Sequence, residues 1–426
     1  MLSSVVKKAK TIDWVYVIDT QIFEYNRYGL KSINPHRMSL LMATLTEIDQ
    51  ILQSLGSHLT VYAGNPLHCI KEHINQHNID LVAVNYHPGF YERKNIFTLK
   101  QSCSATEFEV AFNSSLLTQS SLPWNLESLP STFTPFRKKI ESVACIQPKK
   151  LPAMLFLPAR CSQYPFDKDI FNQLPFAVKI NTNLSGETAA NNSLANYFAS
   201  TAPKSYKTTR NSLEGIDSST RLSHWLSIGC LSPNTVWQKL KAYEAQEGAN
   251  ESTYWIGFEL LWREYFYWYA LKYQQALFAF NGINGRKLLT SFYPSRFKSW
   301  CEGSTPFPLV NAIMKQLNAT GFISNRARQI TASCLVNELA LDWRYGAAYF
   351  DQQLIDIDVA SNWGNWQYIA GVGADPRGGR QFNLQKQQQL YDPAETFINR
   401  WQGKSQLMPI DNVNIDDWPI QHEKKD

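Results

Sequence analysis

Short apolar runs separated by amphipathic stretches dominate the first 120 residues. Three of these runs are rich in β-branched residues and have the length of buried parallel strands: 15–19, 59–64 and 81–86. Between them, residues 38–55 and 66–77 repeat apolar positions with helical spacing. Because strands and helices alternate, we predict an α/β domain over 1–120, built on an open parallel sheet with helices on its faces.

The remainder of the chain has a different pattern. Residues 121–185 hold many Ser, Pro and Thr residues without a sustained period, which is typical of a long connector on the surface. Strand signals then vanish, and residues 186–402 are expected to form a large all-helical domain. Its amphipathic stretches predict these helices: 218–228, 232–246, 254–278, 308–319, 325–341 and 345–354. The polar segment 403–426 is expected to be a poorly ordered tail.

Length and composition agree with two globular domains. A chain of 426 residues is too long for one ordinary core, and its hydrophobic content of 44% excludes a disordered protein. Because no apolar run is long enough for a membrane span and the first ten residues contain no apolar signal core, we expect a cytoplasmic protein with no membrane contact. The seven cysteines never have CxxC spacing, so they are interpreted as reduced thiols.

Aromatic residues change this picture more than charge does. Of 13 tryptophans, only Trp14 and Trp124 precede residue 220. This density in the helical half exceeds what a core requires and indicates stacking on flat ligands or electron relay. The net charge of +5 permits a polyanionic partner but does not require one.

A first group of candidate binding residues lies in the segment DSSTRLSHWL, 217–226. Ser218, Ser219, Thr220 and Arg221 crowd a predicted helix start, where free N–H groups and the helix dipole favour an anion. The alternative is an ordinary capping motif, which is common and is favoured when the segment is considered alone.

A second group lies on one predicted helix, where Glu259, Trp262, Arg263 and Phe266 fall at i, i+3, i+4 and i+7 and therefore share a face. A carboxylate on a buried face costs several kcal/mol unless it is paired or meets a ligand. The alternatives are a Glu–Arg ion pair on a half-exposed helix and a tryptophan that belongs to the core.

A third group combines polar residues from two segments. Asn325, Arg328 and Thr331 share a helix face, and Arg328 could reach Asp356 or Asp358 further along the chain.

One helix face suggests a metal site at first sight. Cys69, His73 and His77 are spaced four residues apart, but their surroundings are polar and no fourth ligand stands at motif spacing. We interpret them as a surface face and predict no metal.

Five segments between Tyr206 and Trp401 occur in an order that resembles the photolyase/cryptochrome family, specifically its DASH cryptochrome branch. They are YKTTRN, SSTRLSHWLSIGCLSP, FELLWREYF, GFISNRARQITASCLVNELALDWR and IDVASNWGNWQYIAGVGADPRGGRQFN. The last two are long enough to be strongly specific. The resemblance implies FAD bound in a U-shape inside the helical domain, with an N-terminal antenna-type α/β domain.

The resemblance also implies roles for individual residues. FAD, chiefly its phosphates, would be contacted by these residues: Tyr206, Ser219, Thr220, Arg221, Leu222 and Ser223. Arg328 and Asp356 would form an ion pair beside the flavin ring, with Asp358 near the ring edge and Asn362 facing flavin N5. Such a pair would let the site hold an anionic reduced flavin.

Further residues match the family's electron relay and its substrate pocket. Trp366, Trp343 and Trp300 match the photoreduction triad, with Trp366 next to the flavin. The catalytic and substrate-binding positions would be these: Glu259, Trp262, Asn325 and Asn362, with Gln329 and Tyr368 at the pocket. A flipped-out pyrimidine dimer would stack and form hydrogen bonds there.

Two of these positions depart from photolyases that act on double strands. Tyr368 replaces a second substrate-facing tryptophan, and Gln329 replaces a frequent methionine. Both agree with the DASH branch, which typically repairs dimers in single-stranded DNA, where less unstacking work is needed. Asn325 stands where (6-4) photolyases have a histidine, which argues against that lesion.

The opening of the chain is a third departure. The family begins with a strand and loop of the type WFRxDLRxxDN, whereas MLSSVVKKA resembles the helix that follows it. The expectation is therefore a domain that lacks its central first strand, as in an N-terminally shortened gene model. Antenna binding of 5,10-methenyltetrahydrofolate is then expected to be weak or absent, and Glu92 is the only candidate ligand.

The function expected from the resemblance is blue-light-driven, FAD-dependent repair of cyclobutane pyrimidine dimers, acting as a monomer on single-stranded DNA. The alternative is a blue-light signalling photoreceptor that uses flavin photoreduction. Glu259, Trp262 and Asn325 favour the enzyme because a sensor needs no lesion pocket. A third hypothesis, a nucleic-acid-binding or RNA-binding protein that works in the dark, has no single-strand binding motif to support it.

Overall fold

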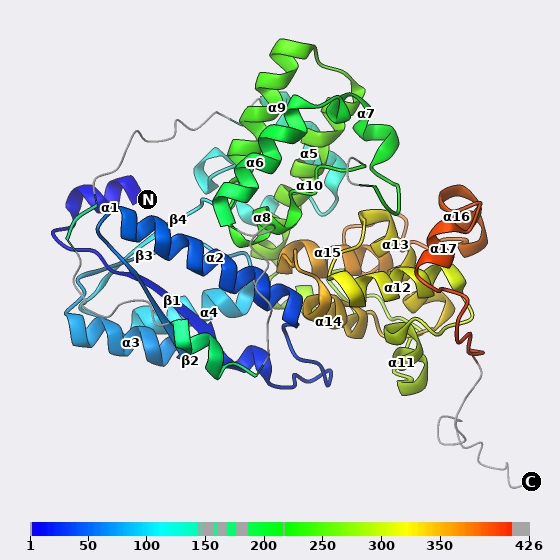
Figure 1. The fold of residues 1–426 in the computed structure, drawn as a ribbon, viewed down its shortest axis with the longest axis horizontal. Helices are drawn as coiled ribbons and strands as arrows, with labels where there is room; N and C mark the ends of the chain where they lie inside the picture. The colour runs from blue at the N-terminus through cyan, green and yellow to red at the C-terminus, as the bar shows by residue number, and fades with distance from the viewer. Residues whose placement is uncertain are drawn as a thin grey trace, which may run out of the picture.

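The computed structural model describes residues 2–143, 146, 157–159, 168–175, 186–215 and 218–410. In Figure 1 the blue and cyan strands and helices of the N-terminal part lie beside the green-to-red helices that make up the rest. The predicted α/β domain followed by a helical domain is confirmed.

The N-terminal part contains four strands and four helices. The strands are β1 (Trp14–Asp19), β2 (Leu59–Gly64), β3 (Leu81–Asn85) and β4 (Glu107–Ala111). The helices are α1 (Leu2–Lys8), α2 (Pro35–Ser54), α3 (Pro66–His77) and α4 (Phe90–Ser102). Asn34 and Asn65 each cap the helix that follows, and a proline occupies the first helical position in both cases. The opening residues are helical, as expected.

The predicted single open sheet is wrong, because the strands form two separate parallel pairs. β1 pairs with β2, with Trp14 opposite Leu59, and β3 pairs with β4, with Leu81 opposite Glu107. Within the described residues, no strand joins the second edge of β1 to that of β3.

The predicted surface connector over 121–185 also needs correction. It contains α5 (Phe133–Val143), whose Phe133, Phe136 and Ile140 are buried in the main hydrophobic core. In Figure 1, α5 lies among the green helices of the C-terminal part. Two short 3₁₀ turns, η2 (Gln119–Ser121) and η3 (Leu126–Ser128), precede it, and η4 (Lys168–Gln173) follows.

The C-terminal part is helical throughout its described residues. Its first helices are α6 (Gly186–Ala199), α7 (Ala202–Thr209), α8 (Ser223–Ile228), α9 (Pro233–Glu247) and α10 (Glu251–Tyr273), followed by η6 (Gln274–Phe278). The later ones are α11 (Pro294–Glu302), α12 (Pro308–Thr320), α13 (Asn325–Ser333), η7 (Cys334–Glu338), α14 (Trp343–Gln353), α15 (Val359–Ala370), α16 (Leu384–Tyr391) and α17 (Thr396–Arg400).

Two predicted helices are shorter than their apolar patterns. The helix expected over 218–228 begins only at Ser223, so 218–222 form a loop before it. The helix expected over 325–341 continues after α13 as the π-helical turn η7 and ends at Glu338. Ordinary apolar periodicity does not separate a π turn from an α turn, since both continue the same buried face.

α10 is the central helix of the larger core. A run of consecutive residues, 264–271, is buried on all its sides. Helices α5, α7, α9 and α15 pack against it. Gly364 of α15 permits the closest approach, because a Cβ at this position would lie 2.3 Å from the Phe266 ring. No described helix is long and apolar enough to cross a membrane.

Candidate functional site

One cavity of about 680 Å³ opens among α7, α8, α10, α13 and α15, within the size range of small-molecule and cofactor sites. Sixteen of the residues proposed from the sequence line it: Tyr206, Ser219, Thr220, Arg221, Leu222, Ser223, Glu259, Trp262, Asn325, Arg328, Gln329, Asp356, Asp358, Asn362, Trp366 and Tyr368. Trp343, Trp300 and Glu92 lie elsewhere. The fold thus brings together segments up to about 160 residues apart in the sequence.

The loop 218–222 forms one end of this cavity. Arg221 adopts the left-handed backbone conformation with φ of 49°, which a non-glycine residue rarely takes. Its Nε is buried, and among the described residues no acceptor faces it. Nη2 of Arg221 donates to the Gly215 carbonyl at 3.2 Å, which anchors the loop. A strained arginine with a free buried nitrogen, beside the Ser219 and Thr220 hydroxyls, fits an anionic ligand group such as a phosphate.

Arg328 and Asp356 form the ion pair that the sequence predicted. Nη2 of Arg328 lies 2.7 Å from Oδ2 of Asp356, and its Nε and Nη2 also donate to the Ile323 carbonyl at 3.2 Å. Burial alone would raise the pKa of Asp356, but the Arg328 guanidinium holds it below its ordinary value. Oδ1 of Asp356 is buried and has no partner among the described residues. It is therefore free to accept a hydrogen bond from a ligand.

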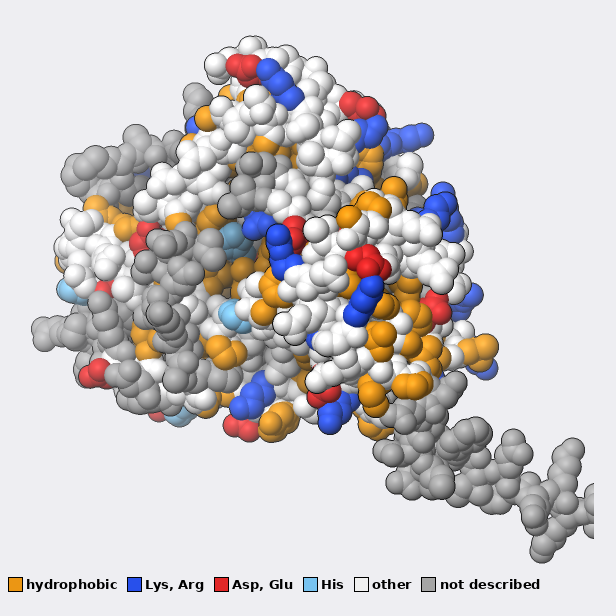
Figure 2. Space-filling model, turned by 45° about the vertical axis from the view of Figure 1, so that its right-hand side comes forward, with side chains coloured by type: hydrophobic (Ala, Val, Ile, Leu, Met, Phe, Trp, Pro, Cys, Tyr) orange, Lys and Arg blue, Asp and Glu red, His pale blue; other side chains and the backbone are white. Residues whose placement is uncertain are grey.

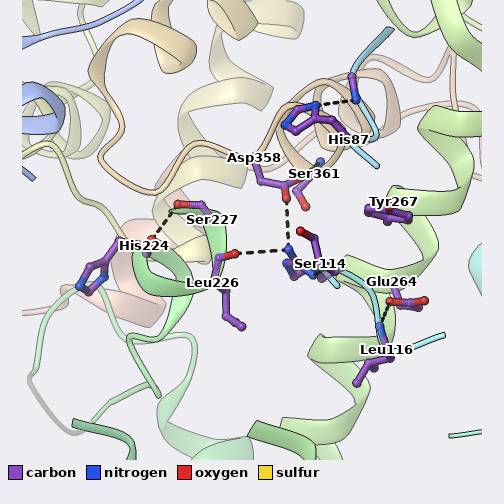
Figure 3. Close-up of polar contacts among 12 residues, drawn as sticks. His87, Ser114, Leu116, His224, Leu226, Ser227, Glu264, Tyr267, Asp358 and Ser361 are labelled. Atoms are coloured by element: carbon purple, nitrogen blue, oxygen red, sulfur yellow. Dashed lines mark hydrogen bonds and ion pairs between the residues drawn. The ribbon is translucent and has the colours of Figure 1, made fainter. Parts of the chain in front are cut away.

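Asp358 is held at the N-terminus of α15 by two groups. Its carboxylate accepts from the Ser361 N–H at 2.8 Å and lies 3.7 Å from Nη2 of Arg263. Arg263 also donates to the Ser114 carbonyl at 2.7 Å and to the Leu226 carbonyl at 3.4 Å. Figure 3 shows Asp358, Ser114 and Leu226 converging on this point. Arg263 therefore joins the cavity wall to the segment that follows β4.

The neighbouring Glu264 continues this junction. Its carboxylate accepts from the Leu116 N–H at 2.8 Å (Figure 3). It also accepts from the Ser115 hydroxyl at 2.5 Å and the Trp268 indole at 2.6 Å. Burial raises the pKa of Glu264, and these donors offset part of that rise. No local feature of the sequence distinguishes Glu264 from other carboxylates on helices. All of its partners except Trp268 lie in a distant segment.

The Glu259 side chain forms an ion pair, but with Arg210 rather than with an arginine of its own helix. Arg210 also lies over the Trp255 ring, 4.1 Å from its centroid. Burial raises the pKa of Glu259, and the Arg210 charge opposes that rise. Arg210 was overlooked as a site residue, although it belongs to the segment YKTTRN that carries Tyr206.

Trp262 lies between aromatic rings at the cavity wall. It stacks on Phe133 with ring centroids 3.8 Å apart and on Phe266 at 5.5 Å. Tyr368 meets it edge-on at 5.8 Å, and the Tyr368 hydroxyl accepts a hydrogen bond from Arg380. Trp262 thus belongs both to the core and to the cavity, so the two alternatives considered for it do not exclude each other.

Asn362 approaches the cavity from α15. Its Nδ2 donates to the Ala347 carbonyl at 3.0 Å and to Oδ1 of Asp351 at 2.8 Å, both on α14. Oδ2 of Asp351 accepts from the Trp363 indole at 2.8 Å. Asp351 carried no signal in the sequence, since it is an ordinary acidic residue on an amphipathic helix.

The three tryptophans of the expected relay are all buried. Trp366 meets Trp300 edge-on with ring centroids 6.2 Å apart, whereas Trp343 meets Trp363 at 5.8 Å. Trp300 has no exposed surface. The ring contacts do not run in the simple order Trp366, Trp343, Trp300.

Two remaining candidates lie away from the cavity. Glu92 is half-exposed in the first turn of α4, with a carboxylate oxygen 3.7 Å from Nδ1 of His87. His73 is buried and not on the surface as expected; its Nδ1 lies 3.0 Å from the Tyr62 hydroxyl and its Nε2 lies 3.2 Å from Asp13. In the part of the chain that the structure describes, no group of three or more His, Cys, Asp or Glu residues could hold a metal ion.

The cavity offers groups that suit a ligand with both phosphates and a hydrogen-bonding polar ring. The Arg221 loop supplies free donors, and Oδ1 of Asp356 supplies a free buried acceptor. These features are those of a flavin dinucleotide site built inside a helical domain.

Comparison with known proteins agrees with an FAD site in the helical domain. A family model described as the FAD binding domain of DNA photolyase matches residues 255–426, and one described as DNA photolyase matches 2–155. The cryptochrome DASH of Idiomarina loihiensis is 46% identical over 97% of this chain and 92% of its own length. That of Vibrio parahaemolyticus is 46% identical over 90% of this chain and 85% of its own length. The solved structure of a Synechocystis cryptochrome superposes with a TM-score of 0.85 at 34% identity, over 96% of this chain and 86% of that one.

The chain therefore belongs to the photolyase/cryptochrome family, and both relatives compared above are cryptochromes of the DASH type. FAD is its cofactor, and its function is of the FAD-dependent photolyase/cryptochrome kind.

Proposed function

We propose that this protein repairs cyclobutane pyrimidine dimers with blue light, as a monomer and chiefly in single-stranded DNA. The observation that supports the proposal is that the candidate substrate residues and the candidate FAD residues line one continuous cavity. A lesion held by Glu259, Trp262 and Asn325 would then lie next to the group that Arg328 and Asp356 hold. Reduced, light-excited FAD, when bound, supplies an electron to the dimer and receives it back after the ring has split.

The side chains of the chain itself would bind and orient both molecules. The loop 218–222 would hold the phosphates of FAD, and Asp356 would accept a hydrogen bond while Arg328 balances negative charge. Trp262 would offer a stacking face, held in place by Phe133. The Glu259 carboxylate would accept from a pyrimidine imide N–H, and the Asn325 amide would complete the hydrogen bonds.

The preference for single strands is inferred from the pocket and from the surface. Tyr368 offers a smaller stacking face than tryptophan, and its hydroxyl is tied to Arg380. Less stacking energy is then available to offset the opening of a duplex. On the face drawn in Figure 2, Lys and Arg are interspersed with Asp and Glu and do not gather in one broad basic field. Strong capture of duplex phosphates is therefore not expected from this face.

The experiment compares dimer loss from single-stranded and duplex oligonucleotides under blue light, starting with fully reduced enzyme. Glu259→Gln keeps size but removes the ion pair and should lower repair at least about tenfold, the range for one buried charged contact. Glu251→Gln is the matched control, because Glu251 is exposed on the same helix and pairs with Lys207 outside the cavity. It should leave repair unchanged.

If neither substrate is repaired while bound FAD still undergoes photoreduction, the proposal fails. A blue-light photoreceptor would then be the better interpretation, since Trp366 at the cavity wall contacts the buried Trp300 without any need for DNA.

A further inference from the structure

The amide of Asn362 has a single orientation that its neighbours allow. One end of this amide faces two acceptors, the Ala347 carbonyl at 3.0 Å and Oδ1 of Asp351 at 2.8 Å. An oxygen placed there would face two other oxygens, so this end must be the NH₂ group. Both amide hydrogens are thereby used. The carbonyl oxygen of Asn362 accepts no hydrogen bond from any described residue and is the end left toward the cavity.

Asp351 is committed to this arrangement by its own surroundings. Its two carboxylate oxygens have one N–H donor each, since Oδ1 accepts from Asn362 and Oδ2 accepts from the Trp363 indole at 2.8 Å. Its backbone carbonyl accepts from Arg37, which reaches it from α2 of the N-terminal part. The orientation of the carboxylate is therefore fixed, and it requires the NH₂ group of Asn362 to face it.

We propose that Asp351 is a positioning residue that turns the Asn362 carbonyl oxygen toward the flavin and thereby favours reduced FAD over oxidised FAD. The inference rests on the proposed function and on the position opposite flavin N5 that the family resemblance implies for Asn362. Oxidised flavin presents a lone pair at N5, which a carbonyl oxygen repels. Reduced flavin presents an N–H at N5, which the same oxygen accepts. Because a ligand bound more tightly in one redox state shifts the equilibrium toward that state, the midpoint potential of bound FAD is raised.

Asp351→Asn tests this orientation without a change of size. An asparagine at 351 has only one oxygen, and two N–H donors, from Asn362 and Trp363, compete for it. If the oxygen goes to Trp363, its NH₂ group faces the NH₂ group of Asn362, so the Ala347 carbonyl alone is left to favour the original orientation and that orientation is no longer fixed. The midpoint potential should then fall by about 30 mV, which corresponds to a tenfold loss of preference for a two-electron couple.

Trp363→Phe is the matched control, because it removes the other donor and leaves the contact between Asp351 and Asn362 intact. Its potential should equal that of the wild type. In the double variant D351N/W363F, the Asn362 NH₂ group is the one remaining donor of the two that faced this side chain. The single oxygen at 351 should therefore accept from Asn362, and the potential should return to the wild-type value. A loss of packing alone would not produce this rescue, since the second substitution would add to the first.

The measurement is a spectroelectrochemical titration of FAD in the purified holoproteins, with circular dichroism as the check on folding. An unchanged potential in D351N overturns the proposal, and so does a fall that the double variant does not reverse. If D351N does not bind FAD but the double variant binds it at the wild-type potential, the proposal is supported. If neither variant binds FAD, the proposal is overturned. No DNA is present, so a protein that repairs nothing still gives a result, and the failure of the repair proposal is distinguishable.

Discussion

Asp356→Ala is the substitution that most directly tests the ion pair of the flavin site. It removes a carboxylate that is only 2% exposed and leaves the Arg328 guanidinium, which is 26% exposed, without its charged partner. Breaking a fully buried pair typically costs about 3–5 kcal/mol. Because Arg328 is partly hydrated and keeps two hydrogen bonds to the Ile323 carbonyl, we expect a smaller cost, about 2–3 kcal/mol.

That cost should appear both in stability and in FAD binding. For a domain of about 200 residues, 2–3 kcal/mol lowers Tm by roughly 5–10 °C. Loss of the acceptor at Oδ1 should weaken FAD by a further tenfold or more, at about 1.4 kcal/mol per factor of ten. The assays are thermal unfolding followed by circular dichroism and the ratio of flavin to protein absorbance after gel filtration.

Asp356→Asn separates the two effects. It keeps an acceptor oxygen and removes the charge, so FAD should be retained better than in the alanine variant at a similar loss of Tm. An alanine variant that holds FAD with the wild-type stoichiometry and melts within about 2 °C of the wild type, less than a 1 kcal/mol change would cause, would refute the assignment of Asp356 to the flavin site.

Three other predictions follow from the same structure. Trp366→Phe keeps the buried shape but removes an easily oxidised ring, so flavin photoreduction should slow at least about tenfold while FAD stays bound; an unchanged rate removes Trp366 from the relay. The N-terminal α/β part, with its two separate strand pairs, should be cleaved by limited proteolysis before the helical core, because unpaired strand edges lower local stability; simultaneous cleavage contradicts this. Burial raises the pKa of Asp351 to about 6, with Arg37 opposing and Glu92 adding to the rise. The native state then binds the proton more tightly than the unfolded chain, so the free energy of unfolding should fall by roughly 2 kcal/mol, relative to D351N, as pH rises from about 4 to 6; urea titrations in which the free energies of both proteins change with pH in the same way refute it.

Local patterns predicted much of the secondary structure. The strands β1, β2 and β3 lie where β-branched runs placed them, and α3 has the predicted bounds, 66–77. These elements are marked by nearby residues: β-branched side chains favour strands, and an asparagine cap followed by proline starts a helix. Helix α5, in contrast, was wrongly predicted to be part of a surface connector. Its apolar face is short and interrupted, so the helix is stabilised by packing against the core of the helical part and not by its local pattern.

The residues that line the cavity were also largely predictable, whereas the contacts that they form with one another and with other segments were not. Motifs placed Glu259, Asn362 and Trp366 at one site, because each motif is a continuous segment whose residue types can be recognised without the fold. Their partners are Arg210, Asp351 and Trp300, which come from other segments.

The sequence by itself determined the two kinds of domain, most of the helix starts and most of the candidate side chains that line the cavity. Those properties depend on spacing within a few residues, which the order of amino acids states directly. Only the tertiary structure decided which charges are paired, how the Asn362 amide is turned and which tryptophans touch. Hydrogen bonds and ring contacts require distances of a few ångströms between segments far apart in the chain, and only the packing of helices against α10 and α15 sets those distances.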